Sequence, residues 1–120
     1  PPTQEITIAW RGEQEIAIPS WHGTLSLAQA EEPGIDPRRL SENPLRIVAR
    51  AGSERLKLDL NRPSRSLKNL YQENGTPART RPWLPLVFVG EKLAYAAGLG
   101  ADVRLANHSG GIRLCWHSSP

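Results

Sequence analysis

The chain has 120 residues, of which 38% are hydrophobic and 22% charged, with a formal net charge of +3 and one cysteine. This length suits one domain with a buried core, and a single cysteine excludes an internal disulfide. The longest apolar stretch, residues 93–101, is far shorter than the roughly 20 residues of a membrane-spanning helix, so we expect no membrane partner.

The sequence contains no methionine, so we expect residues 1–120 to be a single domain cut from a longer protein. The lone Cys115 fits a reducing compartment such as the cytoplasm. The first 43 residues carry three arginines and seven acidic residues, whereas residues 44–120 carry twelve lysines and arginines and five acidic residues. This asymmetry indicates a polyanionic partner bound by one surface, although chance segregation in a mildly basic domain gives the same pattern.

Short strands are predicted in the first part of the chain. Apolar and polar residues alternate over residues 6–10, 16–18 and 25–27, which is typical of strands with one buried face. Residues 28–43 are polar and interrupted by prolines, and they predict a loop or a short helical turn around Arg38, Arg39 and Leu40. The two arginines lie near several acidic residues, so we interpret them as a surface ion-pair cluster in preference to a phosphate contact.

Two further strands are predicted at residues 45–50 and 56–60, and the second places Leu56, Leu58 and Leu60 inward. One principal helix follows, at about residues 65–74. Pro63 with Ser64 or Ser66 can begin it, and Gly75 and Pro77 can end it. Its apolar face repeats at helical spacing through Leu67, Leu70, Tyr71 and Asn74.

The outer face of this helix and its flanks are rich in cations and amides. The outer face carries Arg65, Lys68, Asn69 and Gln72, and the flanks add Arg62, Arg79 and Arg81. Cations beside the amide dipoles of a helix N-terminus attract phosphate, so this surface is a candidate anion-binding platform. An ordinary solvated helix surface is the alternative interpretation.

The second half of the chain again predicts short strands. Residues 76–83 form a tight turn or a single helical turn, and residues 84–89 and 93–99 form a hairpin. Val103 and Leu105 alternate with polar residues, and so do Ile112, Leu114 and Trp116, around a turn at residues 107–111. The predicted fold class is α+β, with many short antiparallel strands and one principal helix.

A family resemblance rests on residues 64–77, on Arg81, and on the stretches 84–88 and 96–99. Together they resemble the C-terminal domain of tRNA(Ile)-lysidine synthetase, whose pattern is roughly Arg-x-Leu-Lys-x-x-x-Gln-Glu-x-Gly-Val-Pro-Pro-Trp-x-Arg, then a Leu-Pro-Leu strand and a closing Ala-Gly-Leu. The chain departs from this pattern at Pro77-Ala78-Arg79, where the family has Pro-Pro-Trp.

The resemblance implies a compact antiparallel β-sandwich-like domain of unusual topology, related to a domain of bacterial phenylalanyl-tRNA synthetase β-subunits. It also implies a parent enzyme, a carbon–nitrogen ligase that uses ATP with magnesium to join lysine to the wobble cytidine of the minor tRNA(Ile). That chemistry would belong to a catalytic domain that is absent from this chain. The chain itself is expected to need no cofactor. The implied partners are the tRNA, at its acceptor stem, and the parent's catalytic domain.

On this basis we expect a set of RNA contacts with no catalytic residue. The expected contacts are Arg62, Arg65, Lys68, Asn69, Gln72, Arg79 and Arg81. Trp83 is a candidate RNA contact, while the other tryptophans are interpreted as core or turn anchors. The alternative function is a structural or protein-interaction domain that does not contact RNA.

The residues that attract catalytic interpretations do not form a site in the sequence. Ser109-Gly110-Gly111 begins like the Ser-Gly-Gly-x-Asp-Ser loop of lysidine synthetases, but Arg113 and Leu114 replace the aspartate and the second serine. We therefore interpret it as a hairpin turn. The three histidines are scattered and Cys115 lacks ligand spacing, so no metal site is predicted and Cys115 is expected to pack as a small buried side chain.

Overall fold

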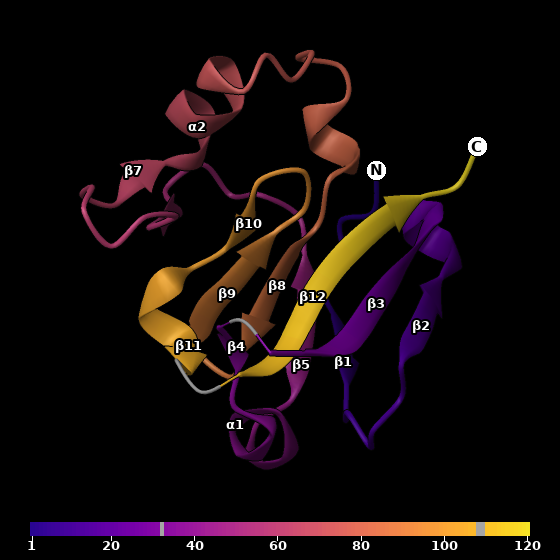
Figure 1. Cartoon of the computed structure of the whole chain (residues 1–120). Coiled ribbons are helices and arrows are strands. Elements are labelled where there is room, and N and C mark those ends of the chain that lie inside the picture. Colours follow the sequence, from indigo (N-terminus) through magenta and orange to yellow (C-terminus); the bar gives the residue numbers. More distant parts are fainter. Residues whose placement is uncertain (32, 108–109) are drawn as a thin grey trace.

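The computed structural model describes residues 1–31, 33–107 and 110–120, and two antiparallel sheets form its frame (Figure 1). The first sheet has the strand order β1-β5-β8-β9-β10, with bounds Ile6–Ile8, Leu45–Val48, Leu86–Val89, Lys92–Ala96 and Gly100–Ala101. The second has the order β11-β4-β12-β3-β2, with bounds Ala106–Asn107, Gly34–Ile35, Gly111–Ser118, Gly23–Ala30 and Glu15–Ile18. A separate two-stranded ribbon pairs β6 (Arg55–Leu56) with β7 (Arg65–Ser66).

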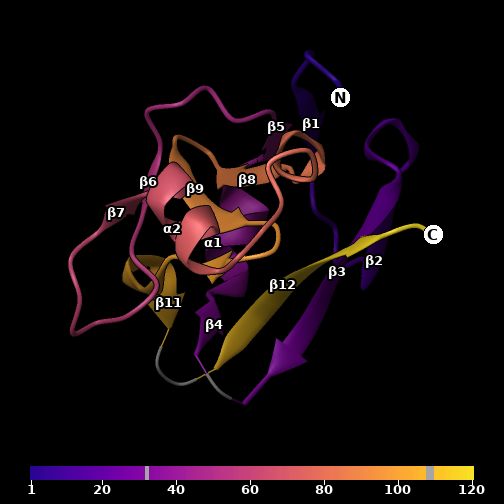
Figure 2. The same ribbon diagram turned by 90° about the horizontal axis from the view of Figure 1, so that it is seen from above.

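Two short α-helices lie at opposite ends of the sheets (Figures 1 and 2). Helix α1 spans Pro37–Glu42, and the Asp36 side chain caps it by accepting a hydrogen bond from the Arg38 amide at 2.9 Å. Helix α2 spans Leu67–Glu73. Three 3₁₀ turns complete the described part of the chain: η1 (Pro19–Trp21), η2 (Arg81–Trp83) and η3 (Val103–Leu105).

The core is built from the alternating apolar residues of the strands. Leu25 and Leu27 from one sheet and Leu45, Ile47 and Leu86 from the other are at most 2% exposed. Burying one such side chain contributes roughly 1.5–3 kcal/mol, so the strand pattern read from the sequence is also the main source of stability. This arrangement is an α+β domain in which two sheets pack together, as predicted.

The close approach of β4 and β12 explains why a glycine stands at the end of the predicted turn at residues 107–111. A Cβ on Gly111 would lie 2.6 Å from the Ile35 carbonyl oxygen, and one on Gly34 would lie 2.9 Å from the Gly111 carbonyl carbon. Only glycine lets β4 and β12 approach this closely. His108 and Ser109, which the predicted turn includes, lie outside the described residues.

Some predicted boundaries were wrong. The segment 28–43 is not only a loop with a helical turn, because β3 continues to Ala30 and β4 follows. The principal helix begins at Leu67 instead of residue 65, since Arg65 and Ser66 pair with β6 and Ser66 caps the helix. Cys115 is only half-buried, because alternate residues of β12 face away from the core.

Two predicted strand segments are replaced by turns. The strand at 56–60 ends at Leu56, and Leu60 is 61% exposed instead of facing inward. The Asp59 side chain accepts a hydrogen bond from the Asn61 amide at 2.8 Å, which favours a turn there. Val103 to Leu105 form η3, because the Asp102 carboxylate caps that turn through the Arg104 amide.

Asp102 ties η3 to the segment after β6. It is 2% exposed, and its carboxylate accepts hydrogen bonds from the Lys57 amide at 3.1 Å and from the Arg104 side chain at 2.7 Å. Burial alone would raise the pKa of Asp102, but the hydrogen bonds from Arg104 and the backbone amides outweigh it, so the pKa is lowered. The carboxylate therefore holds the β6–β7 ribbon against the first sheet in its charged form.

We expect Asp102→Ala to lower the free energy of unfolding by about 1–3 kcal/mol, because the half-buried amides of Lys57 and Arg104 lose their acceptor. Glu42→Ala is the control: it removes an exposed carboxylate from α1, so we expect a loss below about 1 kcal/mol. The pKa of Asp102 is lower in the folded than in the unfolded chain, where it is about 4, so the charged carboxylate stabilises the fold at any pH above about 4. This stabilisation is lost as the pH falls through the pKa of the folded chain. In urea unfolding, the free energy of unfolding of Asp102→Ala should therefore lie below that of the unsubstituted chain at pH 7. This difference should become smaller below about pH 4. Equal losses for the two variants at pH 7 would contradict this role.

Candidate nucleic-acid interface

Helix α2 is positioned by its buried face. The Ser66 hydroxyl accepts a hydrogen bond from the Asn69 amide at 3.2 Å, and Leu67, Leu70 and Tyr71 are buried. The Tyr71 hydroxyl donates to the Ala97 carbonyl oxygen at 2.7 Å, which fixes the helix on the loop after β9. The residues between these anchors must point outward.

The C-terminal end of α2 brings a distant arginine back to the helix. Gly75 has φ +74°, and the Thr76 amide donates to the Tyr71 carbonyl oxygen at 3.0 Å, as in a Schellman motif. Arg81 in η2 then donates from Nε to the Thr76 carbonyl oxygen at 2.9 Å. The predicted helix stop and the predicted turn at 76–83 therefore form one structural unit.

Glu73 pairs with two of the expected RNA contacts. It forms ion pairs with Arg65 and, at 3.6 Å, with Arg62. The hydrogen bond from Arg65 holds the pKa of Glu73 below its usual range, so this carboxylate stays charged at neutral pH. Arg65 lies in β7, before the helix, and α2 has only seven residues. The positive potential of this surface therefore comes from side-chain cations and not from the N-terminus of the helix.

Four of the other expected contacts are exposed, and the fifth, Arg81, is half-buried. Lys68, Asn69 and Gln72 project from α2, and Arg79 lies in the connection to η2. Among the described residues, neither Lys68 nor Arg79 forms an ion pair. The structure thus gathers all seven residues around α2, and their contact with RNA stays a prediction.

Sequence reasoning missed two features of this region. Arg50, read only as the end of a strand, places its guanidinium carbon 5.6 Å from the centre of the Tyr71 ring. His22 stacks on Trp83, with ring centroids 4.8 Å apart and an angle of 18° between the planes. Both are contacts between distant segments, so no local pattern could have revealed them.

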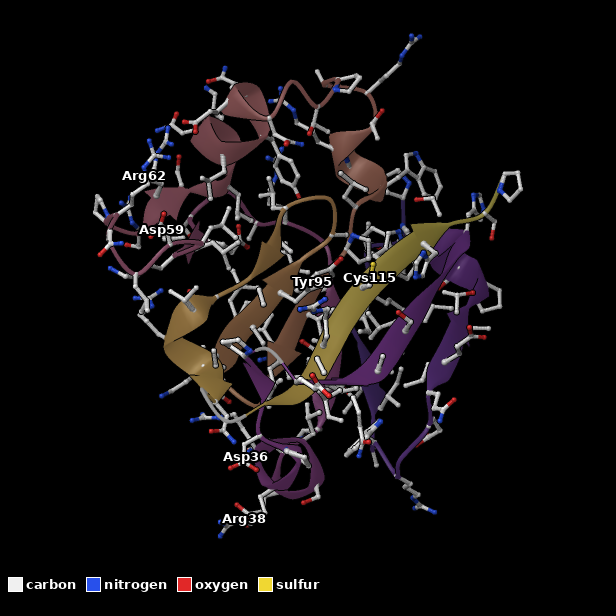
Figure 3. All side chains as sticks on the ribbon, in the orientation of Figure 1. Asp36, Arg38, Asp59, Arg62, Tyr95 and Cys115 are labelled. Carbon is white, nitrogen blue, oxygen red and sulfur yellow. The ribbon has the colours of Figure 1, made fainter. Side chains whose placement is uncertain are left out.

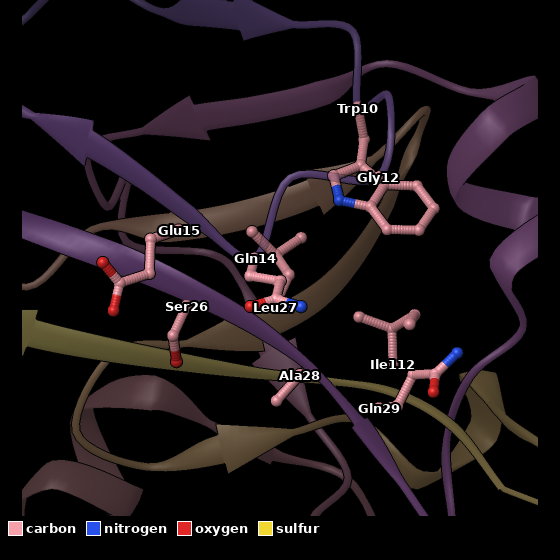
Figure 4. A pocket seen from close by; sticks show the side chains of 9 residues that line it. All are labelled: Trp10, Gly12, Gln14, Glu15, Ser26, Leu27, Ala28, Gln29 and Ile112. Atoms are coloured by element: carbon pink, nitrogen blue, oxygen red, sulfur yellow. The ribbon is translucent and has the colours of Figure 1, made fainter.

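Charges at the other end of the molecule are separate from this surface. Arg38 and Asp36 lie at α1, whereas Arg62 lies beside α2 (Figure 3). A hollow of about 740 Å³ opens between β3 and the turn after β1, with Trp10, Glu15 and Ser26 in its lining (Figure 4). Glu15 is its one ionisable side chain, so the hollow carries no cluster of groups for acid–base chemistry.

The described residues hold no recognisable catalytic or metal cluster. Ser26 Oγ lies 3.3 Å from His117 Nε2, but within the described ranges no carboxylate hydrogen-bonds that histidine to orient it. The described part of the chain contains no group of three or more histidine, cysteine or acidic side chains placed to hold a metal ion. None of its helices has the length and apolar character needed to cross a membrane.

Comparison with known proteins identifies the family. The family described as "TilS substrate C-terminal domain" matches residues 45–116. The crystal structure of a TILS C-terminal domain superposes with a TM-score of 0.68 at 16% identity, covering 98% of this chain and 99% of that one. These matches confirm the resemblance read from residues 64–99 and the α+β fold class.

Curated relatives named tRNA(Ile)-lysidine synthase match over most of the chain. The protein of Nitrosomonas europaea is 39% identical over 93% of this chain and 25% of its own length. That of Ralstonia nicotianae is 43% identical over 86% of this chain and 22% of its own length, and that of Burkholderia pseudomallei is 40% identical over 86% and 21%. The chain thus spans about a quarter of the length of these relatives.

We expect the His22–Trp83 stack to stabilise the junction between η1 and η2. In a double-mutant cycle of His22→Ala and Trp83→Ala, the coupling in the free energy of unfolding should be about 0.5–1.5 kcal/mol, the range for paired aromatic rings. Trp10→Ala with His22→Ala is the control pair, since those rings form no stacked pair. A coupling near zero for the first pair would show that the stack contributes nothing to the fold.

Proposed function

Since the chain belongs to the TilS substrate C-terminal domain family, we propose that it is the tRNA-binding part of a tRNA(Ile)-lysidine synthase and holds the acceptor stem of the minor isoleucine tRNA. The observation that carries this proposal is the surface around α2, where Lys68 and Arg79 are exposed without an acidic partner among the described residues. This surface lies within the residues that match the family.

The chemistry of the surface suits a double-stranded RNA stem. A-form helices are recognised mainly through their shape, their phosphates and their 2′-hydroxyl groups. Lysine and arginine side chains attract the phosphates, while the amides of Asn69 and Gln72 can hydrogen-bond to sugar hydroxyls or phosphates. A short helix fixed on a rigid sheet holds these groups at constant spacing, which recognition by shape requires.

The ligase reaction is assigned to the remainder of the parent protein. The name of the relatives specifies a synthase acting on tRNA(Ile). We propose that ATP with magnesium, the lysine and the wobble cytidine are bound by that remainder in the cytoplasm. The role of this chain is then to position the tRNA while the catalytic domain modifies the anticodon.

One observation favours a second function. Glu73 pairs with Arg62 and Arg65, so two of the seven expected contacts already share one carboxylate within the domain. Such a surface also suits a domain that packs on other parts of the parent protein without touching RNA. The two functions differ in their dependence on salt, because RNA binding releases counterions from the phosphates.

We expect this chain to bind an acceptor-stem minihelix of tRNA(Ile), with an affinity that falls steeply as salt rises. Lys68→Ala and Arg79→Ala should each reduce the slope of log affinity against log salt by roughly 0.9, the value for one phosphate contact. Arg65→Ala should have a smaller effect because Glu73 already neutralises it. Fluorescence anisotropy at several salt concentrations measures the salt slope of all three variants. Arg11→Ala, in the acidic part of the chain, is the control. Absence of binding at low salt by the folded chain would favour the packing function.

We further expect Glu73→Gln to strengthen RNA binding by about threefold at low salt, and by less at 0.15 M salt, where charges are screened. The substitution removes a negative charge beside the RNA surface and frees Arg62 and Arg65. Glu42→Gln, in α1 at the opposite end, removes the same charge from a distant place. An equal gain in both variants would mean that only net charge matters and that α2 does not face the RNA.

A further inference from the structure

A small basic hollow lies between the start of β9, η3 and the β6–β7 ribbon. It has a volume of about 310 Å³, and its lining consists of Arg55, Lys92, Leu93, Asp102, Arg104 and Leu105. Three of these residues are cations and one is a carboxylate, so the lining carries a net positive charge. Ligand pockets have volumes of about 300–1,000 Å³, so a hollow of this size takes one small ligand.

Short backbone hydrogen bonds hold the three walls of this hollow together. The Asp102 amide donates to the Ala94 carbonyl oxygen at 2.9 Å, which joins the start of η3 to β9. The Val103 amide donates to the Lys57 carbonyl oxygen at 2.8 Å, which joins η3 to the segment after β6. Each of the three cations is at most two residues from one of these bonds, so the fold places all three around one space.

Two of the cations are oriented by hydrogen bonds that leave donors unused. Arg104 donates from Nε and Nη2 to the Asp102 carboxylate at 2.9 and 2.7 Å. Arg55 donates from Nη2 to the Ser64 carbonyl oxygen at 2.6 Å. The Nη1 group of each arginine has no partner among the described residues. Both guanidinium groups are therefore fixed in place and can still donate to a ligand.

Asp102 is fully occupied and does not compensate the other two cations. Its two oxygens accept hydrogen bonds from the Lys57 and Arg104 amides and from two nitrogens of the Arg104 side chain. Within the described ranges, neither Arg55 nor Lys92 forms an ion pair. Both are exposed, and the Arg104 side chain is 54% exposed, so a ligand in solution can reach all three.

We propose that Arg55, Lys92 and Arg104 form a second anion site, which binds one phosphate of the RNA backbone. For the source of that phosphate, the site rests on the proposed function. Two guanidinium groups and one ammonium group suit a phosphate, because its several oxygens can accept charge-assisted hydrogen bonds from all of them. None of the three cations belongs to the family motif read from residues 64–99.

The position of the hollow favours RNA over a separate acidic partner. Arg55 pairs with Ser66 across the ribbon, and Ser66 caps α2 two residues before Lys68. The hollow therefore adjoins the N-terminal end of the surface around α2. One polyanionic strand that contacts Lys68 can continue across the ribbon to the hollow.

The first test uses inorganic phosphate and needs no RNA. Two-dimensional NMR follows the Nε–Hε signals of Arg55 and Arg104 as phosphate replaces chloride at constant ionic strength. We expect both signals to move with one dissociation constant, and Lys92→Gln to weaken binding by about fivefold, the value for one exposed charge pair. Arg11, which is exposed in the turn after β1, is the matched control. Responses of Arg55 and Arg104 no larger than that of Arg11 would overturn the site.

The second test asks whether the three cations share one phosphate of the RNA. The double variant of Arg55→Gln and Lys92→Gln should reduce the salt slope of minihelix binding by about 0.9 in total, the value for one phosphate. Lys68→Ala with Lys92→Gln should reduce it by more than either change alone, because those lysines contact different phosphates. A reduction near 1.8 in the first double variant would mean two separate phosphates and would overturn the shared site.

Lys92→Gln keeps the test decisive if Arg55→Gln does not fold. Lys92 is exposed and forms no ion pair with the described residues, so its substitution should leave the fold intact. An unchanged salt slope in Lys92→Gln, equal to that of the Arg11→Ala control, would overturn the site.

The two tests separate this site from the proposed function. Minihelix binding that responds to Lys68→Ala but not to Lys92→Gln overturns the site and leaves the RNA function standing. A phosphate response of Arg55 and Arg104, without minihelix binding by the folded chain, overturns the RNA function and with it the assignment of this site to RNA.

Discussion

The anchoring of α2 through Tyr71 is the contact on which the candidate interface depends. A helix of seven residues has too few internal hydrogen bonds to be stable alone, so tertiary packing must hold it. Tyr71 supplies this packing with a fully buried ring and a hydrogen bond from its hydroxyl to the Ala97 carbonyl. Leu67 and Leu70 complete the buried face. Every outward-facing cation and amide of the helix takes its position from these three residues.

The charges around α2 are arranged in two groups with different roles. Arg62 and Arg65 are paired with Glu73, so they connect the loop before β7 to the last turn of the helix, and the carboxylate offsets one of their two positive charges. Lys68 and Arg79 have no such partner among the described residues. In the proposed function, an RNA strand that follows the unpaired cations would pass Lys68 in the first turn of α2 and Arg79 beyond its C-terminal end.

The rest of the molecule serves mainly to hold this surface rigid. Two antiparallel sheets with a continuous apolar core carry α2 and η2 at one end, and the buried Asp102 fixes the β6–β7 ribbon that leads into the helix. The large hollow near Trp10 and Glu15 is lined without a cluster of reactive groups. The two sheets thus supply the frame from which α2 and η2 present the proposed RNA surface.

The sequence by itself determined the features that depend on neighbouring residues: a serine cap at Ser64 or Ser66, the apolar spacing of Leu67, Leu70 and Tyr71, the stop at Gly75, the alternating strands and the family motif. Caps, periodicity and positive φ are local properties, so a sequence pattern can reveal them. Only the tertiary structure decided which arginines form ion pairs with Glu73, that the Arg50 guanidinium lies over the Tyr71 ring, and that His22 stacks on Trp83. These contacts join segments far apart in the chain, and they depend on how the two sheets pack, which no local spacing encodes.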